Sequence, residues 1–160
     1  MGYVYLPVLI SAIFCLGLFG CDRPNHAQST NVASTISERA VPQLIEATLA
    51  NDSEQVKSLL QNGTDPNLIH NTNTALTYAA RDGFTEIAKL LIANGADINW
   101  IDGEGVTPLI LASFKNNLEI TVLLLHHGAD KKVKDQWNRS ALDYALRRGE
   151  ADPIAKLLQI

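Results

Sequence analysis

Residues 76–97 read "LTYAARDGFTEIAKLLIANGAD", and the pattern recurs without internal gaps from Leu109 as "LILASFKNNLEITVLLLHHGAD". An earlier copy, "LIEATLANDSEQVKSLLQNGTD", begins at Leu44. A later copy, "LDYALRRGEADPIAKLLQ", begins at Leu142 and matches with one inserted residue. The alanine shared by the four copies stands at positions 47, 79, 112 and 145, so the copies follow one another at nearly equal intervals. This regular period predicts an architecture in which one structural unit is stacked several times.

Each copy predicts two helices that have one apolar face. Leu109, Ala112 and Ser113 share a face of the first helix, and Ile120 and Leu124 share a face of the second. The small alanine allows a neighbouring helix to approach closely. One helix pair cannot bury its apolar side alone, so we expect the stability to come from stacking between units.

The segment between two copies, "NGADINWIDGEGVTPLILA" at residues 94–112, has the residues of a connection. Gly95 is expected to end a helix in the left-handed conformation, and Gly105 to allow a tight turn, with Asn138 in the same place one unit later. Thr107 is placed to cap the next helix, with Pro108 at its first position. These residues therefore join two units and are not arranged for a reaction.

The recurring Thr-Pro-Leu and Gly-Ala-Asp elements resemble the ankyrin repeat. The resemblance implies an all-α repeat solenoid in which about four helix-turn-helix repeats are joined by β-hairpin-like fingers. The expected ankyrin domain covers residues 37–160, with repeats at about 38–68, 69–101, 102–134 and 135–160. The first copy has Val-Pro-Gln-Leu at residues 41–44 in place of Thr-Pro-Leu, which suggests a capping repeat.

Residues 1–21, "MGYVYLPVLISAIFCLGLFGC", contain no charged side chain. Such a run is either a signal sequence or a short membrane anchor. Its end, Leu18-Phe19-Gly20-Cys21, resembles the lipobox of bacterial lipoproteins, although Phe19 is bulky for its position and no Lys or Arg precedes the run. The resemblance implies a signal peptide at residues 1–20 and a lipid on Cys21, and an uncleaved anchor is the alternative.

The segment after Cys21 is polar, and residues 21–36 are expected to be a lipidated cysteine followed by a flexible tether. The other cysteine, Cys15, lies inside the apolar run, so no disulfide is expected in the mature chain. We expect a lipid-anchored protein at the cell membrane that faces the periplasm. Asp22 slightly favours the inner membrane over the outer membrane.

Composition and motifs argue against several functions. The net charge of −4 gives no reason to expect a nucleic-acid partner. The sequence has no G-x-S-x-G, P-loop, H-E-x-x-H or G-x-G-x-x-G motif, so no enzyme, cofactor or small-molecule substrate is predicted. The pair His126-His127 has only Asp130 close by as a third ligand, so no metal site is predicted.

The resemblance implies that fingers and first helices form a concave binding surface. The candidate contacts are aromatic and basic residues of these elements, which suit protein recognition: Trp100 and Trp137 in the fingers, and Tyr78, Arg81, Phe114, Lys115, Tyr144 and Arg147 on the helices. Alternatively, each Trp ring packs on the neighbouring finger. Tyr78 and Tyr144 occupy the same repeat position, which favours partial burial.

The predicted function is therefore a membrane-anchored module that binds a protein partner on a rigid concave surface. The alternative is an immunity or inhibitor protein that neutralises a periplasmic toxin or hydrolase. The sequence does not identify the partner, because ankyrin-like surfaces serve many different contacts.

Overall fold

The computed structural model describes residues 41–160. Helices in this range form four pairs: α2 (Gln43–Leu49) with α3 (Ser53–Gln61), α4 (Ala75–Asp82) with α5 (Thr85–Ala93), α6 (Pro108–Lys115) with α7 (Leu118–His126), and α8 (Ala141–Leu146) with α9 (Pro153–Gln159). The predicted signal peptide, Cys21 and the tether lie outside the described residues. Within residues 41–160, every helix is too short or too polar to cross a membrane.

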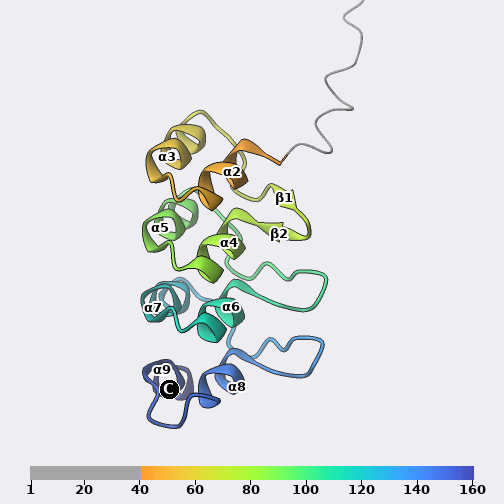
Figure 1. The fold of residues 1–160 in the computed structure, drawn as a ribbon, viewed down its shortest axis with the longest axis vertical. Helices are drawn as coiled ribbons and strands as arrows, with labels where there is room; N and C mark the ends of the chain where they lie inside the picture. Colours follow the sequence, from red (N-terminus) through yellow and green to blue (C-terminus); the bar gives the residue numbers. More distant parts are fainter. Residues whose placement is uncertain (1–40) are drawn as a thin grey trace, which may run out of the picture.

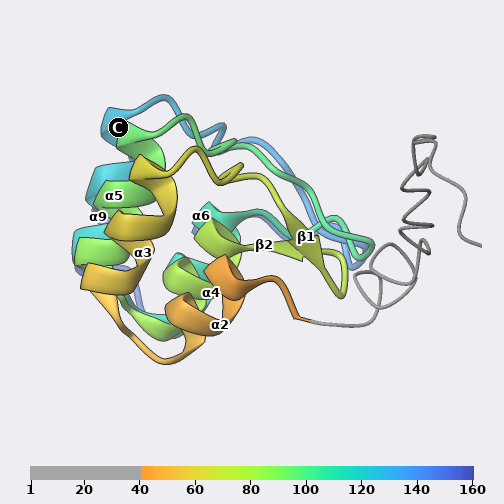
Figure 2. The same cartoon turned by 90° about the horizontal axis from the view of Figure 1, so that it is seen from above.

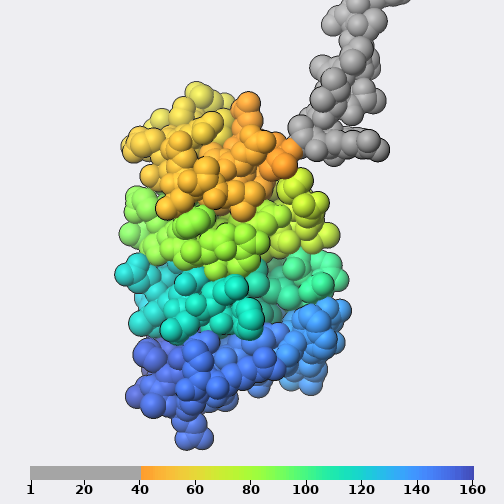
Figure 3. Space-filling model, in the orientation of Figure 1, coloured from red at the N-terminus to blue at the C-terminus, as the bar shows by residue number. Residues whose placement is uncertain are grey.

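The four pairs are stacked in chain order, one above the other (Figure 1). Helices α3, α5, α7 and α9 form an outer column, and α2, α4, α6 and α8 form an inner column (Figure 1). Seen from above, the connecting fingers project from the inner column on the side away from the outer helices (Figure 2). The space-filling view shows the repeats as successive layers (Figure 3). The predicted all-α solenoid is confirmed. We call the surface formed by the inner helices and the fingers the concave face.

The core runs through all four layers. The repeated alanines at positions 47, 79, 112 and 145 are at most 2% exposed. They lie on the inner helices, where α6 packs against both α4 and α8. A small side chain is needed at these positions because a larger one would separate neighbouring inner helices.

The predicted helix boundaries are confirmed in detail. Thr107 Oγ1 accepts a hydrogen bond from the backbone N–H of Ile110 at 3.2 Å, and Pro108 begins α6. Ser140 forms a capping box with Asp143 at the start of α8. Gly95 has a φ of 87°, which is the left-handed conformation expected after α5.

The first finger (residues 65–74) contains the described strands. Ile69–His70 (β1) pairs antiparallel with Asn73–Thr74 (β2). The two residues between the strands, Asn71 and Thr72, have positive φ values of 49° and 69°, as a tight hairpin turn requires. This compact turn explains why the interval from Ala47 to Ala79 is slightly shorter than the two intervals that follow it.

The second finger (residues 97–106) and the third (residues 130–139) turn differently. Asp102 Oδ1 accepts hydrogen bonds from the backbone N–H groups of Glu104 and Val106. Asp135 Oδ1 does the same one repeat later. An aspartate side chain therefore closes each of these turns without a regular hairpin.

Candidate functional site

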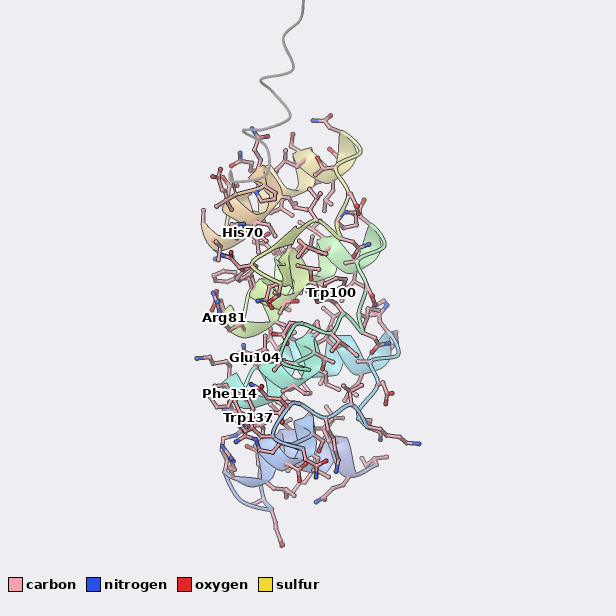
Figure 4. The ribbon with its side chains drawn as sticks, turned by 90° about the vertical axis from the view of Figure 1, so that its right-hand side faces the viewer. His70, Arg81, Trp100, Glu104, Phe114 and Trp137 are labelled. Carbon is pink, nitrogen blue, oxygen red and sulfur yellow. The ribbon has the colours of Figure 1, made fainter. Side chains whose placement is uncertain are left out.

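A groove of about 390 Å³ lies on the concave face, where the second and third fingers meet α6 and α8. We call it the C-terminal groove. Its lining combines apolar, aromatic and charged side chains: Glu104, Val106, Ile110, Leu111, Phe114, Trp137, Arg139, Tyr144 and Arg147. In Figure 4, Glu104, Phe114 and Trp137 follow one another along one edge of the molecule.

Two aromatic rings from neighbouring inner helices meet at this groove. Phe114 and Tyr144 pack edge to face, with ring centroids 5.4 Å apart and planes at 75°. Phe114 is 48% exposed although it is large and apolar. The guanidinium carbon of Arg147 lies 5.1 Å from the centroid of the Tyr144 ring, and Lys115 Nζ lies 5.4 Å from that of Phe114. Such exposed combinations of rings and cations are common at protein-binding surfaces.

The third finger brings Trp137 and Arg139 to the same groove. The Trp137 side chain is 55% exposed. The guanidinium carbon of Arg139 lies 4.6 Å from the centroid of Trp137 and 4.9 Å from that of Tyr144. One cation therefore lies close to a ring of the finger and a ring of α8.

Asp135 holds this finger against α8. It is 5% exposed. Tyr144 donates its hydroxyl hydrogen to Asp135 Oδ2 at 2.5 Å, and the backbone N–H groups of Trp137 and Arg139 donate to Oδ1 at 2.9 and 3.0 Å. Burial opposes the charge, but these hydrogen bonds and the nearby Arg139 outweigh it, so the pKa of Asp135 lies below its usual value. Burial and the bond to Asp135 raise the pKa of Tyr144.

Trp100 has a different environment from Trp137. It lies before the turn of the second finger and is half-buried. Its Nε1–H donates to the backbone oxygen of Thr72 at 2.9 Å, so the side chain links the second finger to the first. Figure 4 shows Trp100 apart from the edge that carries Trp137. The structure therefore favours the packing interpretation for Trp100, whereas Trp137 lies at the C-terminal groove.

A family model described as ankyrin repeats, in three copies, matches residues 44–135, which is more than half of the chain. The chain belongs to the ankyrin-repeat family. The structure adds a further ankyrin-like helix pair, α8 and α9, after the matched range. Ankyrin repeats are protein-binding modules without catalytic activity, and this agrees with the prediction that the chain is not an enzyme.

Several curated proteins are similar to this ankyrin domain. Human cyclin-dependent kinase 4 inhibitor B is 33% identical over 62% of this chain and 72% of its own length. The bovine protein of the same name is 32% identical over 72% of this chain and 88% of its own length. Human transient receptor potential cation channel subfamily A member 1 is 44% identical over 39% of this chain, but this match covers 6% of the channel protein.

The other predicted contacts lie one ankyrin repeat towards the N-terminus. Tyr78 is 8% exposed, like Tyr144, and its hydroxyl donates to the backbone oxygen of His70 at 3.1 Å. Arg81 binds Asp82 through two hydrogen bonds of 2.8 and 2.6 Å, which lower the pKa of Asp82. Tyr78 and Arg81 line a smaller groove of about 150 Å³. This groove shares Glu104, Val106 and Leu111 with the C-terminal groove.

Arg148 directly follows Arg147 beyond the end of α8, and its side chain is bound within the domain. It pairs with Asp152, with 2.7 Å between Nε and Oδ2, and its Nη1 donates to the backbone oxygen of Ser113 at 2.7 Å. The side chain therefore ties the fourth repeat to the end of α6. Arg147, by contrast, lines the C-terminal groove.

The C-terminal groove also contains residues that were not among the predicted contacts. Arg139 and Glu104 are the charged ones, and Val106, Ile110 and Leu111 form the apolar part of the lining. Alignment of the repeats gives one sequence signal for Glu104 and Val106 as groove residues. Glu104 occupies the position of Trp137 one ankyrin repeat earlier, and Val106 occupies that of Arg139. The contact between Arg139 and two rings depends on the packing of the finger on α8.

The histidine pair of the third ankyrin repeat lies away from this face. His126 and His127 are exposed at the end of α7, with ring centroids 5.2 Å apart. Among residues 41–160, no three His, Cys, Asp or Glu side chains are grouped closely enough to hold a metal ion.

Proposed function

We propose that this ankyrin domain binds a protein partner in the C-terminal groove, with Phe114, Trp137 and Arg147 as its main contacts. The observation that supports the proposal is the convergence of large exposed side chains on a groove with apolar lining. The bonds between Asp135, Tyr144 and the third finger hold Trp137 and Arg139 in place before a partner arrives. Little conformational entropy is then lost on binding, so a few contacts can give useful affinity.

The two tryptophans are expected to respond differently to replacement by alanine. Trp137→Ala should weaken capture of the native partner about tenfold or more, because a large exposed anchor is removed, and should leave stability nearly unchanged. Trp100→Ala should lower the free energy of unfolding by about 1–2 kcal/mol, because it removes buried ring area and the hydrogen bond to Thr72. The measurements are quantitative pull-down from the envelope fraction and urea unfolding followed by circular dichroism.

These two variants control for each other, since each removes one indole from a finger. Equal partner capture by wild type and Trp137→Ala would exclude Trp137 as a contact. A further variant, Phe114→Ala, probes the opposite side of the groove and should also reduce capture. If neither variant reduced capture, the partner would bind elsewhere and the proposed groove would be wrong.

We also propose that a lipid on Cys21 anchors the domain to the cell membrane on the periplasmic side, with the inner membrane slightly favoured. The support is the lipobox-like ending of an uncharged apolar run. Mass spectrometry should find a chain that begins at Cys21 and carries a diacylglycerol-sized addition. Cys21→Ser should abolish both processing and lipid attachment, whereas Cys15→Ser should abolish neither. A wild-type chain that retains residues 1–20 would contradict the anchor.

A second proposal is that binding inhibits the partner, as an immunity protein inhibits a periplasmic toxin or hydrolase. It is favoured by the similarity to proteins named as inhibitors of a cyclin-dependent kinase. If the captured partner is an enzyme, adding purified protein should lower its rate, and Trp137→Ala should lower it less. If an enzyme is captured but retains its full rate, inhibition is excluded and the scaffold role remains.

A further inference from the structure

The cations at the C-terminal groove have few partners of their own. Within residues 41–160, the side chain of Arg147 forms neither a hydrogen bond nor an ion pair, and its described contact is with the ring of Tyr144. Nε of Arg139 is buried and ion-paired with Oδ2 of Asp135 at 3.5 Å, so an outside acceptor can meet this partly exposed side chain only through its terminal Nη groups, which form no hydrogen bond in this range. Both guanidinium groups therefore retain capacity to bind an acceptor from outside the domain.

The rest of the groove is suited to an apolar side chain. Ile110 and Val106 are 2% and 8% exposed, and together with Leu111 they form the apolar part of the lining. Phe114 adds an exposed ring beside them. An apolar residue that enters this groove would lose contact with water on the side that faces the lining.

The charge distribution along the solenoid also favours a negatively charged acceptor at this groove. Residues 41–107 contain nine acidic and three basic side chains, whereas residues 108–160 contain six acidic and eight basic ones. The C-terminal groove lies mostly in the second range, and its exposed acidic residue, Glu104, comes from the first. Positive potential is therefore expected on the side of the groove formed by α8 and the third finger.

We propose that the C-terminal groove binds a peptide segment in which an acidic residue stands beside a large apolar one. The apolar residue enters the groove against Val106, Ile110 and Phe114. The carboxylate binds Arg147 and Arg139, whose planar guanidinium groups match a carboxylate in geometry. The inference rests on the proposed protein-binding function of the same groove and adds the chemistry of the partner.

A carboxylate suits this groove better than a phosphate group does. Glu104 lines the groove and the Asp135 carboxylate lies beside Arg139, so a dianionic phosphate would meet more repulsion than a carboxylate with a single charge. The net charge of −4 likewise opposes the binding of a nucleic acid.

The test uses the purified full-length chain in mild detergent and a phage-displayed library of short random peptides as the probe. The selected peptides are expected to be enriched in Asp or Glu next to an aromatic or large aliphatic residue. Arg147→Gln should weaken binding of these synthetic peptides about two- to fivefold, the range expected for an exposed charged contact. Glu104→Gln should strengthen it about twofold, because a repulsive charge is removed. Lys156→Gln on the outer helix α9 removes one positive charge away from the groove and should have no effect.

Peptide binding is expected to weaken in Arg147→Gln and to strengthen in Glu104→Gln. A general effect of the substitutions on folding would not change binding in opposite directions. Peptides that depend on Trp137 but lack acidic residues would overturn the inference and leave the proposed function intact. A selection that yields no peptides sensitive to either Trp137→Ala or Arg147→Gln would overturn it as well, and the pull-down of the native partner would then decide the proposed function. Binding to phosphatidylglycerol vesicles that is lost in Arg147→Gln, without loss of peptide binding, would assign this arginine to a membrane surface instead.

Discussion

Replacing Leu109 with alanine is expected to lower the free energy of unfolding by about 2–5 kcal/mol, the range for truncating a fully buried leucine. Leu109 is 1% exposed and lies in α6, the inner helix that packs against both α4 and α8. Its loss would leave a cavity in the middle of the stack, where each repeat is stabilised by its neighbours. Urea unfolding followed by circular dichroism measures the change.

Leu118→Ala is the matched control for this prediction. It removes the same atoms from the adjacent helix α7, but Leu118 is 40% exposed, so the expected loss is below about 1 kcal/mol. Equal destabilisation by the two variants would show that burial in the stack of inner helices does not determine stability here. A loss of cooperativity in Leu109→Ala alone would show that the repeats on either side of α6 unfold separately.

The second large effect is expected for Asp135→Ala, which should lower the free energy of unfolding by about 2–4 kcal/mol. The variant would leave Tyr144 Oη and the backbone N–H groups of Trp137 and Arg139 without their acceptor. Because the Tyr144 hydroxyl is in a buried contact, water replaces the lost bond poorly. The third finger would then be held less firmly, so binding in the C-terminal groove should weaken together with stability.

Asp102→Ala provides the control, since Asp102 occupies the same repeat position and also accepts two backbone N–H groups. Position 111 is a leucine where the next repeat has Tyr144, so Asp102 has no tyrosine partner. We expect Asp102→Ala to cost about 1–2 kcal/mol. If Asp135→Ala cost no more than this, the bond to Tyr144 would contribute nothing to stability.

The pH dependence of the Asp135 contribution follows from its lowered pKa. A carboxylate with a folded pKa below its unfolded value stabilises the folded state above the unfolded value, about 3.9 for aspartate, and loses this contribution as the pH falls through the folded pKa. The stability difference between wild type and Asp135→Ala should therefore stay constant above about pH 5 and shrink below about pH 4. A difference that persists unchanged into stronger acid would show that the charge of Asp135 is not responsible.

Much of the repeat architecture could be predicted because its signals are local. Gly95, Thr107 and Pro108 act through their own backbone conformation or through a bond to a near neighbour in the chain, so the helix ends follow from the order of residues. The repeated alanines similarly indicate close helix packing, because an alanine on an apolar helix face has room for a neighbour. The chemistry of the groove was harder to predict, since its residues come from two fingers and two inner helices.

The sequence by itself determined the repeat period, the two helices of each repeat and the residues that cap them, because these features depend on neighbours along the chain. Only the tertiary structure decided that Trp100 bonds to the preceding finger while Trp137 stays exposed beside Arg139 and Tyr144. Both indoles lie in finger segments of the sequence, but at different repeat positions, since Glu104 and not Trp100 corresponds to Trp137. Their environments differ because contacts across repeats depend on how each finger turns and packs, and the buried carboxylate of Asp135 directs the third finger onto α8.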